Sequence, residues 1–177
     1  EPFYWSGKMY DFKFDGEFFV LGKAEENQVQ IWMRDNSVGS DFNLLTTLTP
    51  PENTRSFGSS VALSNGRIVV GAPDDTRGDL RNGGAVYVYK RDGLAWSPEI
   101  KVMSELAGSG ERFGRSVALS GNTLLIGAGG GARSSSALSG DYPASVYSYE
   151  LPTIWSLSVL HSTGGSVSSS PSGIDCG

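Results

Sequence analysis

Two stretches of this sequence nearly repeat each other, and this limits the folds that the chain can adopt. Residues 57–73 begin with Phe-Gly, continue through Ser-Val-Ala-Leu-Ser and end in an apolar run closed by Gly-Ala-Pro. Residues 113–128 follow the same order, from Phe-Gly to an apolar run closed by Gly-Ala. A second shared stretch, Val-Tyr-x-Tyr, follows each of them, at 86–89 and at 146–149. Repeats of this length predict supersecondary units that bury a core only by stacking on their neighbours.

A weaker copy of the repeat stands at the front of the chain. Residues 28–35 match 85–92 in the spacing of their apolar and charged positions. This copy lacks the Phe-Gly pair, and Gly7-Lys8 stands near that place. We therefore expect three units, at residues 5–52, 53–109 and 110–163.

Each unit is predicted to contain four short strands. In the middle unit the expected strands are Ser59–Leu63, Arg67–Ala72, Ala85–Lys90 and Trp96–Val102. The Asn65-Gly66 pair predicts a tight hairpin, because both residues tolerate a positive φ. The second strand is nearly all apolar and should be buried on both faces, whereas the third alternates and should be half-buried. No stretch shows a sustained helical period. The fold class expected is all-β: propeller blades of four antiparallel strands, three of them in this chain.

The motif Phe-Gly-x-Ser-Val-Ala-Leu-Ser, then Gly-Ala-Pro, then Gly-Ala-Val-Tyr-Val-Tyr, resembles the FG-GAP repeat of integrin-α-like β-propellers. The resemblance covers residues 5–163 and is strongest in the middle unit. It implies an extracellular or cell-surface location, a binding or scaffolding role and no catalysis. Propellers of this family close with about seven blades, so three blades form an incomplete ring or part of a larger propeller.

Composition limits the partners. The net charge is −5, which gives no electrostatic reason to bind nucleic acid, and no apolar run is long enough to cross a membrane. The single cysteine, Cys176, provides neither an internal disulfide nor a zinc site. We expect no cofactor, apart from calcium in one loop, and we expect protein partners or other copies of the chain.

The calcium candidate is the loop that contains Asp74, Asp75 and Asp79. The resemblance implies it, because some integrin-type blades bind calcium at this place. The carboxylate spacing departs from that pattern and Arg77 adds a positive charge, so a solvated acidic turn is the alternative. The same loop spells Arg77-Gly78-Asp79, a tripeptide that integrins recognise, and is therefore also an interaction candidate.

Four residues have a predicted structural role. Phe57 and Phe113 should fill the core between blades, and Gly58 and Gly114 should allow the backbones to approach closely. The aromatic residues of the strands are expected to pack between blades rather than to form a ligand platform.

Residues 164–177 are predicted to form a Ser/Gly-rich tail or linker after the blade segment 1–163, because this composition cannot bury enough apolar surface. Runs of serine and threonine near proline also suit O-glycosylation in secreted proteins. The candidate acceptors are Ser162, Thr163, Ser166, Ser168, Ser169, Ser170 and Ser172.

The leading functional hypothesis is a non-catalytic extracellular structural or adhesive module that acts through protein contacts. Bare blade faces and strand edges invite pairing, so assembly of copies into a larger surface structure or filament is expected. A ligand-binding segment of a longer secreted or cell-surface receptor, for sugar or protein, is the alternative. A carbohydrate-active enzyme is a remote third possibility, which would need two carboxylates facing each other.

Overall fold

Every regular element of the described chain is a β-strand. The computed structural model describes residues 8–35, 42–51, 54–76, 81–104, 109–129 and 144–152. These residues form three antiparallel sheets and contain no helix, which confirms the all-β prediction. The first sheet holds β1 (Asp11–Phe14), β2 (Phe18–Lys23), β3 (Gln28–Arg34) and β4 (Phe42–Leu48). The second holds β5 (Ser60–Ser64), β6 (Arg67–Ala72), β7 (Ala85–Asp92) and β8 (Ala95–Val102). The third holds β9 (Ser116–Ser120), β10 (Thr123–Ala128) and β11 (Ser145–Glu150).

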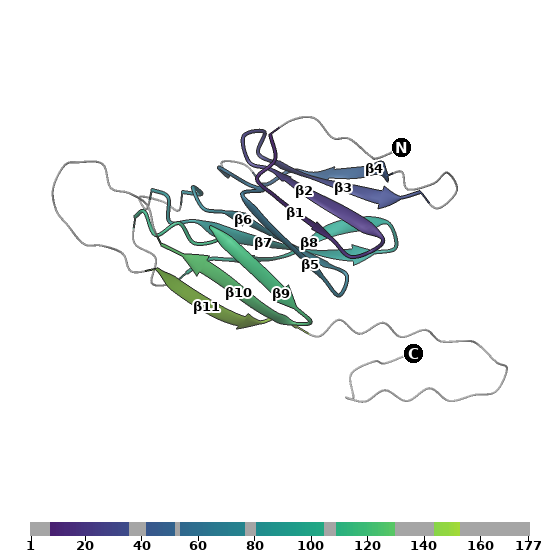
Figure 1. The fold of residues 1–177 in the computed structure, drawn as a ribbon. Coiled ribbons are helices and arrows are strands. Elements are labelled where there is room, and N and C mark those ends of the chain that lie inside the picture. The colour runs from purple at the N-terminus through teal and green to yellow at the C-terminus, as the bar shows by residue number, and fades with distance from the viewer. Residues whose placement is uncertain are drawn as a thin grey trace, which may run out of the picture.

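The three sheets stack on one another as blades (Figure 1). In each sheet every strand pairs with the next one along the chain, and we call the sheets blade 1, blade 2 and blade 3 in chain order. Each unit was predicted to have four strands, and the residues after 152, where the fourth strand of blade 3 is expected, are outside the described part of the chain. Neighbouring blades approach most closely at their first strands, since β1 lies beside β5 and β5 lies beside β9. This arrangement is that of β-propeller blades, as the repeat predicted.

Tight turns set the register within the blades. Asn65 and Gly66 join β5 to β6 with φ values of 55° and 69°, so the predicted hairpin is confirmed. The third and fourth strands of blades 1 and 2 each carry a register shift, between Ile31 and Trp32 and between Val88 and Tyr89. The two shifts occupy equivalent places, so even this irregularity belongs to the repeat.

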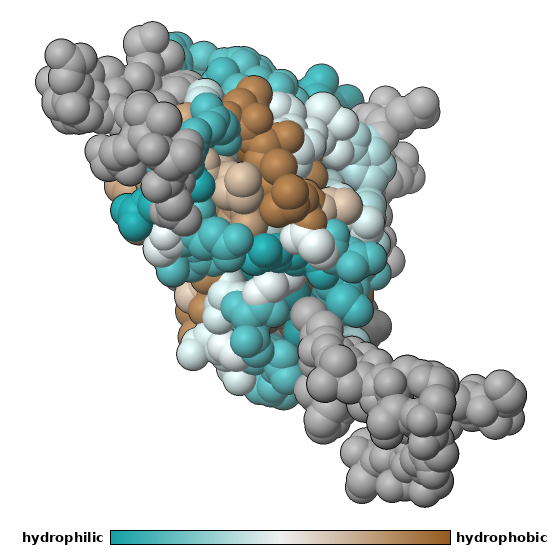
Figure 2. All heavy atoms as spheres, turned by 90° about the vertical axis from the view of Figure 1, so that its right-hand side faces the viewer, coloured by the Kyte–Doolittle hydropathy of each residue, from teal (hydrophilic) through white to brown (hydrophobic). Residues whose placement is uncertain are grey.

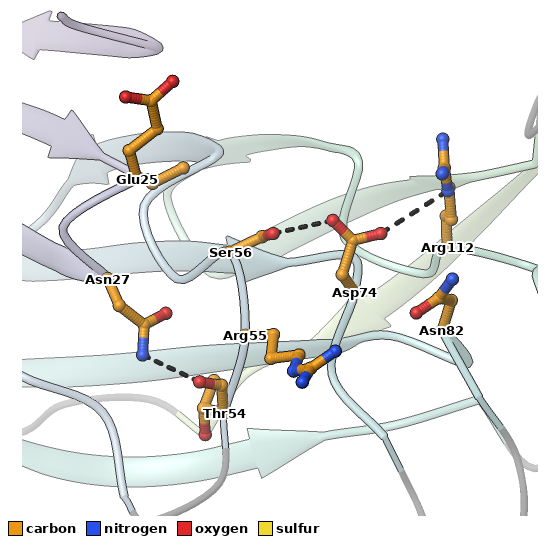
Figure 3. A pocket seen from close by; sticks show the side chains of 9 residues that line it. Glu25, Asn27, Thr54, Arg55, Ser56, Asp74, Asn82 and Arg112 are labelled. Carbon is orange, nitrogen blue, oxygen red and sulfur yellow. Dashed lines mark hydrogen bonds and ion pairs between the residues drawn. The ribbon is translucent and has the colours of Figure 1, made fainter.

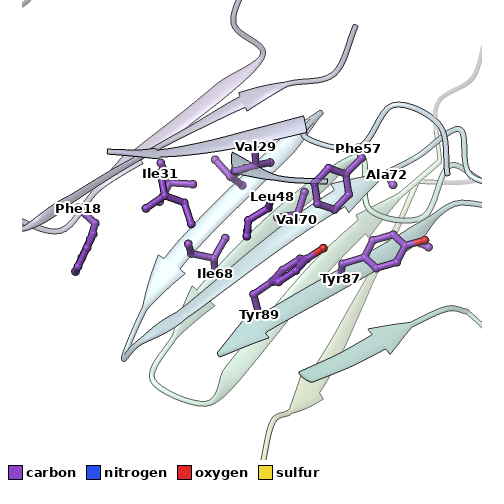
Figure 4. Packing of buried hydrophobic residues seen from close by; sticks show 13 residues of the cluster. Phe18, Val29, Ile31, Leu48, Phe57, Ile68, Val70, Ala72, Tyr87 and Tyr89 are labelled. Carbon is purple, nitrogen blue, oxygen red and sulfur yellow. The ribbon is translucent and has the colours of Figure 1, made fainter. Parts of the chain in front are cut away.

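Two hydrophobic clusters hold the blades together, one on each side of blade 2. Toward blade 1, side chains of Ile68 and Val70 pack against residues such as Val29 and Ile31 (Figure 4). Toward blade 3, the intervening Val69 packs in a separate cluster. All six residues of β6 are buried, which confirms that this strand is covered on both faces.

The prediction that β7 is half-buried is wrong. Its first five residues, Ala85–Tyr89, are all buried. Tyr87 and Tyr89 belong to the cluster shared with blade 1, while Val86 and Val88 belong to the cluster shared with blade 3. The sequence alternates in residue type, but a middle blade has a neighbour on each side and both faces are therefore covered.

Phe57 and Phe113 fill the cores between blades, as predicted. Both are fully buried. The Phe57 ring contacts Tyr87 of its own blade edge-on, with ring centroids 5.6 Å apart. Phe113 contacts Tyr147 in the same way at 5.2 Å. Each phenylalanine thus precedes its blade and folds back onto the third strand of that blade.

Gly58 and Gly114 allow the close approach of backbones that was predicted for them. They have φ values of +93° and +87°, which favour glycine. A Cβ atom placed on Gly22 of blade 1 would lie 2.1 Å from the carbonyl oxygen of Gly58. A Cβ atom on Gly71 of blade 2 would lie 2.0 Å from the carbonyl oxygen of Gly114. The same glycine-to-glycine junction therefore joins blade 1 to blade 2 and blade 2 to blade 3.

A buried arginine ties blade 2 to the far end of blade 3. Arg67 is fully buried, and its guanidinium donates two hydrogen bonds of 2.8 Å to the carboxylate of Glu99 in β8. It also donates to the Asn122 side chain at 3.0 Å and to the carbonyl oxygen of Pro152. These hydrogen bonds from Arg67 hold the pKa of Glu99 below its ordinary value.

The junction predicts a difference between two matched substitutions. In both Gly71→Ala and Gly127→Ala, the new methyl group would lie 2.2 Å from a serine hydroxyl of its own blade. Only in Gly71→Ala would it also collide with a carbonyl of the next blade, that of Gly114. We expect Gly71→Ala to lower the free energy of unfolding by ~2 kcal/mol more than Gly127→Ala. Urea unfolding of the two variants measures this, and equal losses would contradict the account of the junction.

The Arg67–Glu99 pair predicts a pH dependence. Because the pKa of Glu99 is lowered from 4.5, its contribution to stability is complete above that pH and is lost as the pH falls toward the folded value. At neutral pH we expect Glu99→Gln to cost about 2 kcal/mol in unfolding free energy. The gap between the variant and the unsubstituted chain should narrow below pH 4.5.

Glu17→Gln is the control for this pH dependence. Glu17 pairs with Arg91, but its side chain is 55% exposed, so its loss should cost little. A constant gap for Glu99→Gln across the acid range would contradict the prediction.

Candidate interaction surfaces

The residues that lead into each blade can be aligned by their hydrogen bonds. The carbonyl oxygen of Gly71 accepts from both Gly58 N and Ser59 N, and that of Gly127 accepts from both Gly114 N and Arg115 N. In blade 1 the carbonyl oxygen of Gly22 accepts from Tyr10 N at 3.0 Å. In the strand register, Asp11 pairs with Gly22 as Ser60 pairs with Gly71, so Tyr10 is the counterpart of Ser59, the residue that follows the Phe-Gly pair.

Lys8 and Met9 therefore occupy the Phe-Gly place of blade 1. The sequence had indicated Gly7-Lys8 near that place, which is one residue too early. The Lys8 side chain is 75% exposed and pairs with Glu25 at 2.8 Å, so it does not fill a core as Phe57 does. Blade 1 thus starts with a different kind of segment from the other two blades.

Among the described residues, no blade covers the outer face of blade 3, and we call this face bare. In blade 2 the residues Val69 and Val86 are fully buried beneath blade 3. At the equivalent places in blade 3, Leu125 is 42% exposed and Val146 is 74% exposed. The alternating exposure along β11 shows the same thing, since one face of that strand packs on blade 2 and the other faces solvent.

The bare face of blade 3 carries the same serine and glycine as the face of blade 2 that blade 3 covers. In blade 2 the hydroxyl of Ser60 donates to the carbonyl oxygen of Gly114 at 2.9 Å, across the junction. Ser116 stands at the same place in blade 3, opposite Gly127 in the β9–β10 register. Within the described part of the chain, the Ser116 hydroxyl has no hydrogen-bond partner. A Cβ atom on Gly127 would have only Ser116 atoms as its nearest neighbours.

Blade 1 also exposes large apolar side chains. Phe12 is 54% exposed, Phe14 is 47% exposed and Leu44 is 48% exposed. Phe14 contacts the Phe42 ring at 5.7 Å, and the guanidinium of Arg34 lies over the Phe14 ring at 5.2 Å. Figure 2 shows apolar side chains gathered on the face that it presents, above a band of polar residues.

A polar groove lies over the loops at one end of the blades (Figure 3). It has a volume of about 610 Å³. The lining residues come from the β2–β3 loop, the segments before β5 and β9, and the β6–β7 loop: Ala24, Glu25, Asn27, Thr54, Arg55, Ser56, Asp74, Asn82 and Arg112. Arg112 faces Asp74 at 3.5 Å, whereas Arg55 has no carboxylate partner among the described residues.

Hydrogen bonds fix the floor of this groove. The Asn27 amide donates to the carbonyl oxygen of Thr54 at 2.7 Å, and the Thr54 hydroxyl bonds to the Tyr87 hydroxyl at 2.8 Å. The Tyr87 hydroxyl donates to Asp75 at 3.1 Å, and the Lys101 ammonium donates to the same carboxylate at 2.9 Å. Burial lowers the pKa of Lys101, but hydrogen bonds to Tyr87 and Asp75 outweigh it, so the net shift is upward.

Of the predicted calcium ligands, Asp74 and Asp75 both have protein partners. Asp74 accepts from the Ser56 hydroxyl at 2.6 Å and faces Arg112, while Asp75 is engaged by Tyr87 and Lys101. In the ranges that the structure describes, no three acidic, histidine or cysteine side chains gather at one point. The calcium loop stays a prediction, since its third member, Asp79, is not among those residues.

Other predicted sites also lie outside the described residues. They are Arg77, Gly78 and Asp79 of the tripeptide, and the O-glycan candidates Ser162, Thr163, Ser166, Ser168, Ser169, Ser170 and Ser172. Sequence reasoning missed Ser116 and Gly127 as surface features. The sequence did contain a signal for this surface, because the serine that opens Ser-Val-Ala-Leu-Ser occurs in both units. Only the structure shows that Ser60 donates a hydrogen bond to the next blade whereas Ser116 lies on an exposed face.

Stacked antiparallel meanders of four, four and three described strands, in which a Phe-Gly segment leads into each of blades 2 and 3, define a β-propeller module. The FG-GAP repeat model matches residues 51–89 and 96–147, together just over half of the chain. The chain therefore belongs to the FG-GAP repeat family. Repeats of this family are typical of extracellular and cell-surface proteins.

A search of curated proteins finds no match. Among solved structures, the crystal structure of the computationally designed Ika4 protein is similar, with 12% identity over 82% of this chain and 92% of that one and a TM-score of 0.37. Across the described segments, no helix has the length and apolar character needed to span a membrane.

The groove floor predicts different costs for two neighbouring aspartates. Asp75 is buried and accepts charge-assisted hydrogen bonds, so Asp75→Asn should lower the free energy of unfolding by about 2 kcal/mol. Asp74→Asn is the matched control, and its half-exposed carboxylate should cost under ~1 kcal/mol. Chemical denaturation distinguishes them, and a larger loss for Asp74→Asn would contradict the assignment.

Proposed function

We propose that this chain is a non-catalytic structural module of an extracellular or cell-surface protein, acting through protein–protein contacts at the outer face of blade 3. Its partners are proteins, including other copies of the chain. Family membership supports this proposal, because FG-GAP propellers are generally binding modules.

The observation that carries the proposal is the bare face of blade 3. Leu125 and Val146 are exposed there, although their counterparts Val69 and Val86 are completely covered in blade 2. Exposed apolar side chains on a flat sheet face favour association, because covering them removes apolar surface from water. A rigid stack of blades behind the face keeps it preformed, so little conformational entropy is lost on docking.

Self-association at high concentration tests the proposal. We expect the apparent mass of the chain, measured by sedimentation velocity, to rise with concentration as copies cover their bare faces. Leu125→Glu and Val146→Glu should each reduce this rise, because docking would then bury an unpaired carboxylate.

The control is Leu94→Glu, which makes the same chemical change at a residue that is 53% exposed in the β7–β8 turn, away from the face. It should leave the association unchanged. A mass independent of concentration, or an equal effect of Leu94→Glu, would count against blade 3 as the contact surface.

A further inference from the structure

The two junctions seen between blades have the same parts. On the entering side, a glycine with a positive φ follows a buried phenylalanine, as at Gly58 and Gly114. On the receiving side, a strand glycine leaves room for the entering carbonyl, as at Gly22 and Gly71. Each junction therefore has a donor half, the Phe-Gly pair, and an acceptor half, the strand glycine.

Blade 3 has a complete acceptor half. Gly127 stands at the place of Gly71, and nothing from another blade occupies the space where its Cβ atom would be, as judged from the described residues. Ser116 stands at the place of Ser60, whose hydroxyl donates to the entering glycine carbonyl in the observed junction. The exposed Leu125 and Val146 flank this point on the same face.

Blade 1 has no donor half. Met9 stands where Gly58 and Gly114 stand, and its φ is not positive. A Cβ atom on Gly58 would lie 2.7 Å from the carbonyl oxygen of Gln28 in the preceding blade, so a side chain at this place obstructs entry. Lys8 replaces the buried phenylalanine with an exposed, ion-paired ammonium. The start of blade 1 therefore cannot enter a junction as the other two blades do.

We infer that the blade array is directional: the outer face of blade 3 accepts a further blade led by a Phe-Gly pair, and blade 1 is not such a blade. The entering glycine carbonyl accepts a hydrogen bond from the Ser116 hydroxyl and lies against Gly127. This inference rests on the proposed function and names its partner. Blade 1 of a second copy does not serve as that partner, so copies do not join head to tail through this junction.

A gain-of-function variant of the full chain tests the inference. Lys8→Phe combined with Met9→Gly gives blade 1 a donor half, and copies should then associate head to tail with a dissociation constant at least roughly tenfold lower than that of the unsubstituted chain. Sedimentation velocity measures the association. Lys8→Phe alone is the control, because it adds apolar surface without the glycine, and it should not reproduce the gain.

Adding Gly127→Ala to the double variant should abolish the gain, because the methyl group fills the space for the entering carbonyl. Ser116→Ala should reduce it less. Equal association of Lys8→Phe alone, or persistence of the gain with Gly127→Ala, would overturn the inference.

A peptide experiment gives the same test without relying on the folding of a variant. A synthetic peptide with the sequence of residues 54–64 carries the donor half and should shift the NMR amide signals of Ser116 and Gly127 in the unsubstituted chain. The peptide with Phe57→Lys and Gly58→Met should not. Shifts elsewhere only, or equal shifts from both peptides, would contradict the inference.

Different experimental results would contradict the proposed function and the inference. Leu125→Glu tests whether the outer face of blade 3 takes part in association. Gly127→Ala leaves the apolar side chains of that face in place and tests whether the partner's backbone packs against the glycine. Association lost with Leu125→Glu but unaffected by Gly127→Ala in the double variant would retain the proposed function and overturn the inference.

Discussion

At each boundary between blades, a glycine carbonyl packs directly against a strand glycine of the preceding blade. This contact sets the distance between sheets, because any side chain at Gly22 or Gly71 would collide with the carbonyl of Gly58 or Gly114. With that distance fixed, Phe57 and Phe113 fit between the sheets and the valines of β6 and β7 can be buried on both sides. The packing of the apolar core is thus a consequence of backbone geometry at two points.

Polar interactions fasten the blades at their two ends. Near the start of β6, the buried Arg67 reaches Glu99 within its own blade and Asn122 and the Pro152 carbonyl of blade 3. At the other end, the Asn27 side chain of the β2–β3 loop donates to the carbonyl oxygen of Thr54 and accepts from the backbone N–H of Phe57. These two hydrogen bonds join blade 1 to the segment that leads into blade 2. Burial also raises the pKa of Tyr89 to about 12, so this ring stays neutral over the ordinary pH range. The hydrogen bonds that Arg67 and Asn27 make between blades are directional, so they resist a sliding of the sheets that apolar contacts alone permit.

The sequence predicted most of the fold because local rules and the repeat agree. Asn65-Gly66 marked a hairpin, the apolar run 67–72 marked a doubly covered strand, and Phe57 marked a core residue. The prediction from sequence was wrong where the burial of a strand depends on a neighbouring blade. The alternation in β7 resembles that of a half-exposed strand, and nothing local shows that blade 3 covers its second face. Arg67 gave no signal either, since a charged residue at a strand end is ordinarily exposed.

The sequence by itself determined the blade repeat, because residue spacing, turn glycines and apolar periodicity are local properties. The identity of the candidate surface was decided only by the tertiary structure. Ser60 and Ser116 occupy the same place in the same motif, yet one donates across a junction and the other faces solvent. Likewise, only the hydrogen-bond register shows that Lys8-Met9 stands where Phe-Gly stands elsewhere. The reason is physical: whether a face is covered depends on which blade stacks against it, and stacking joins residues that are distant in the chain.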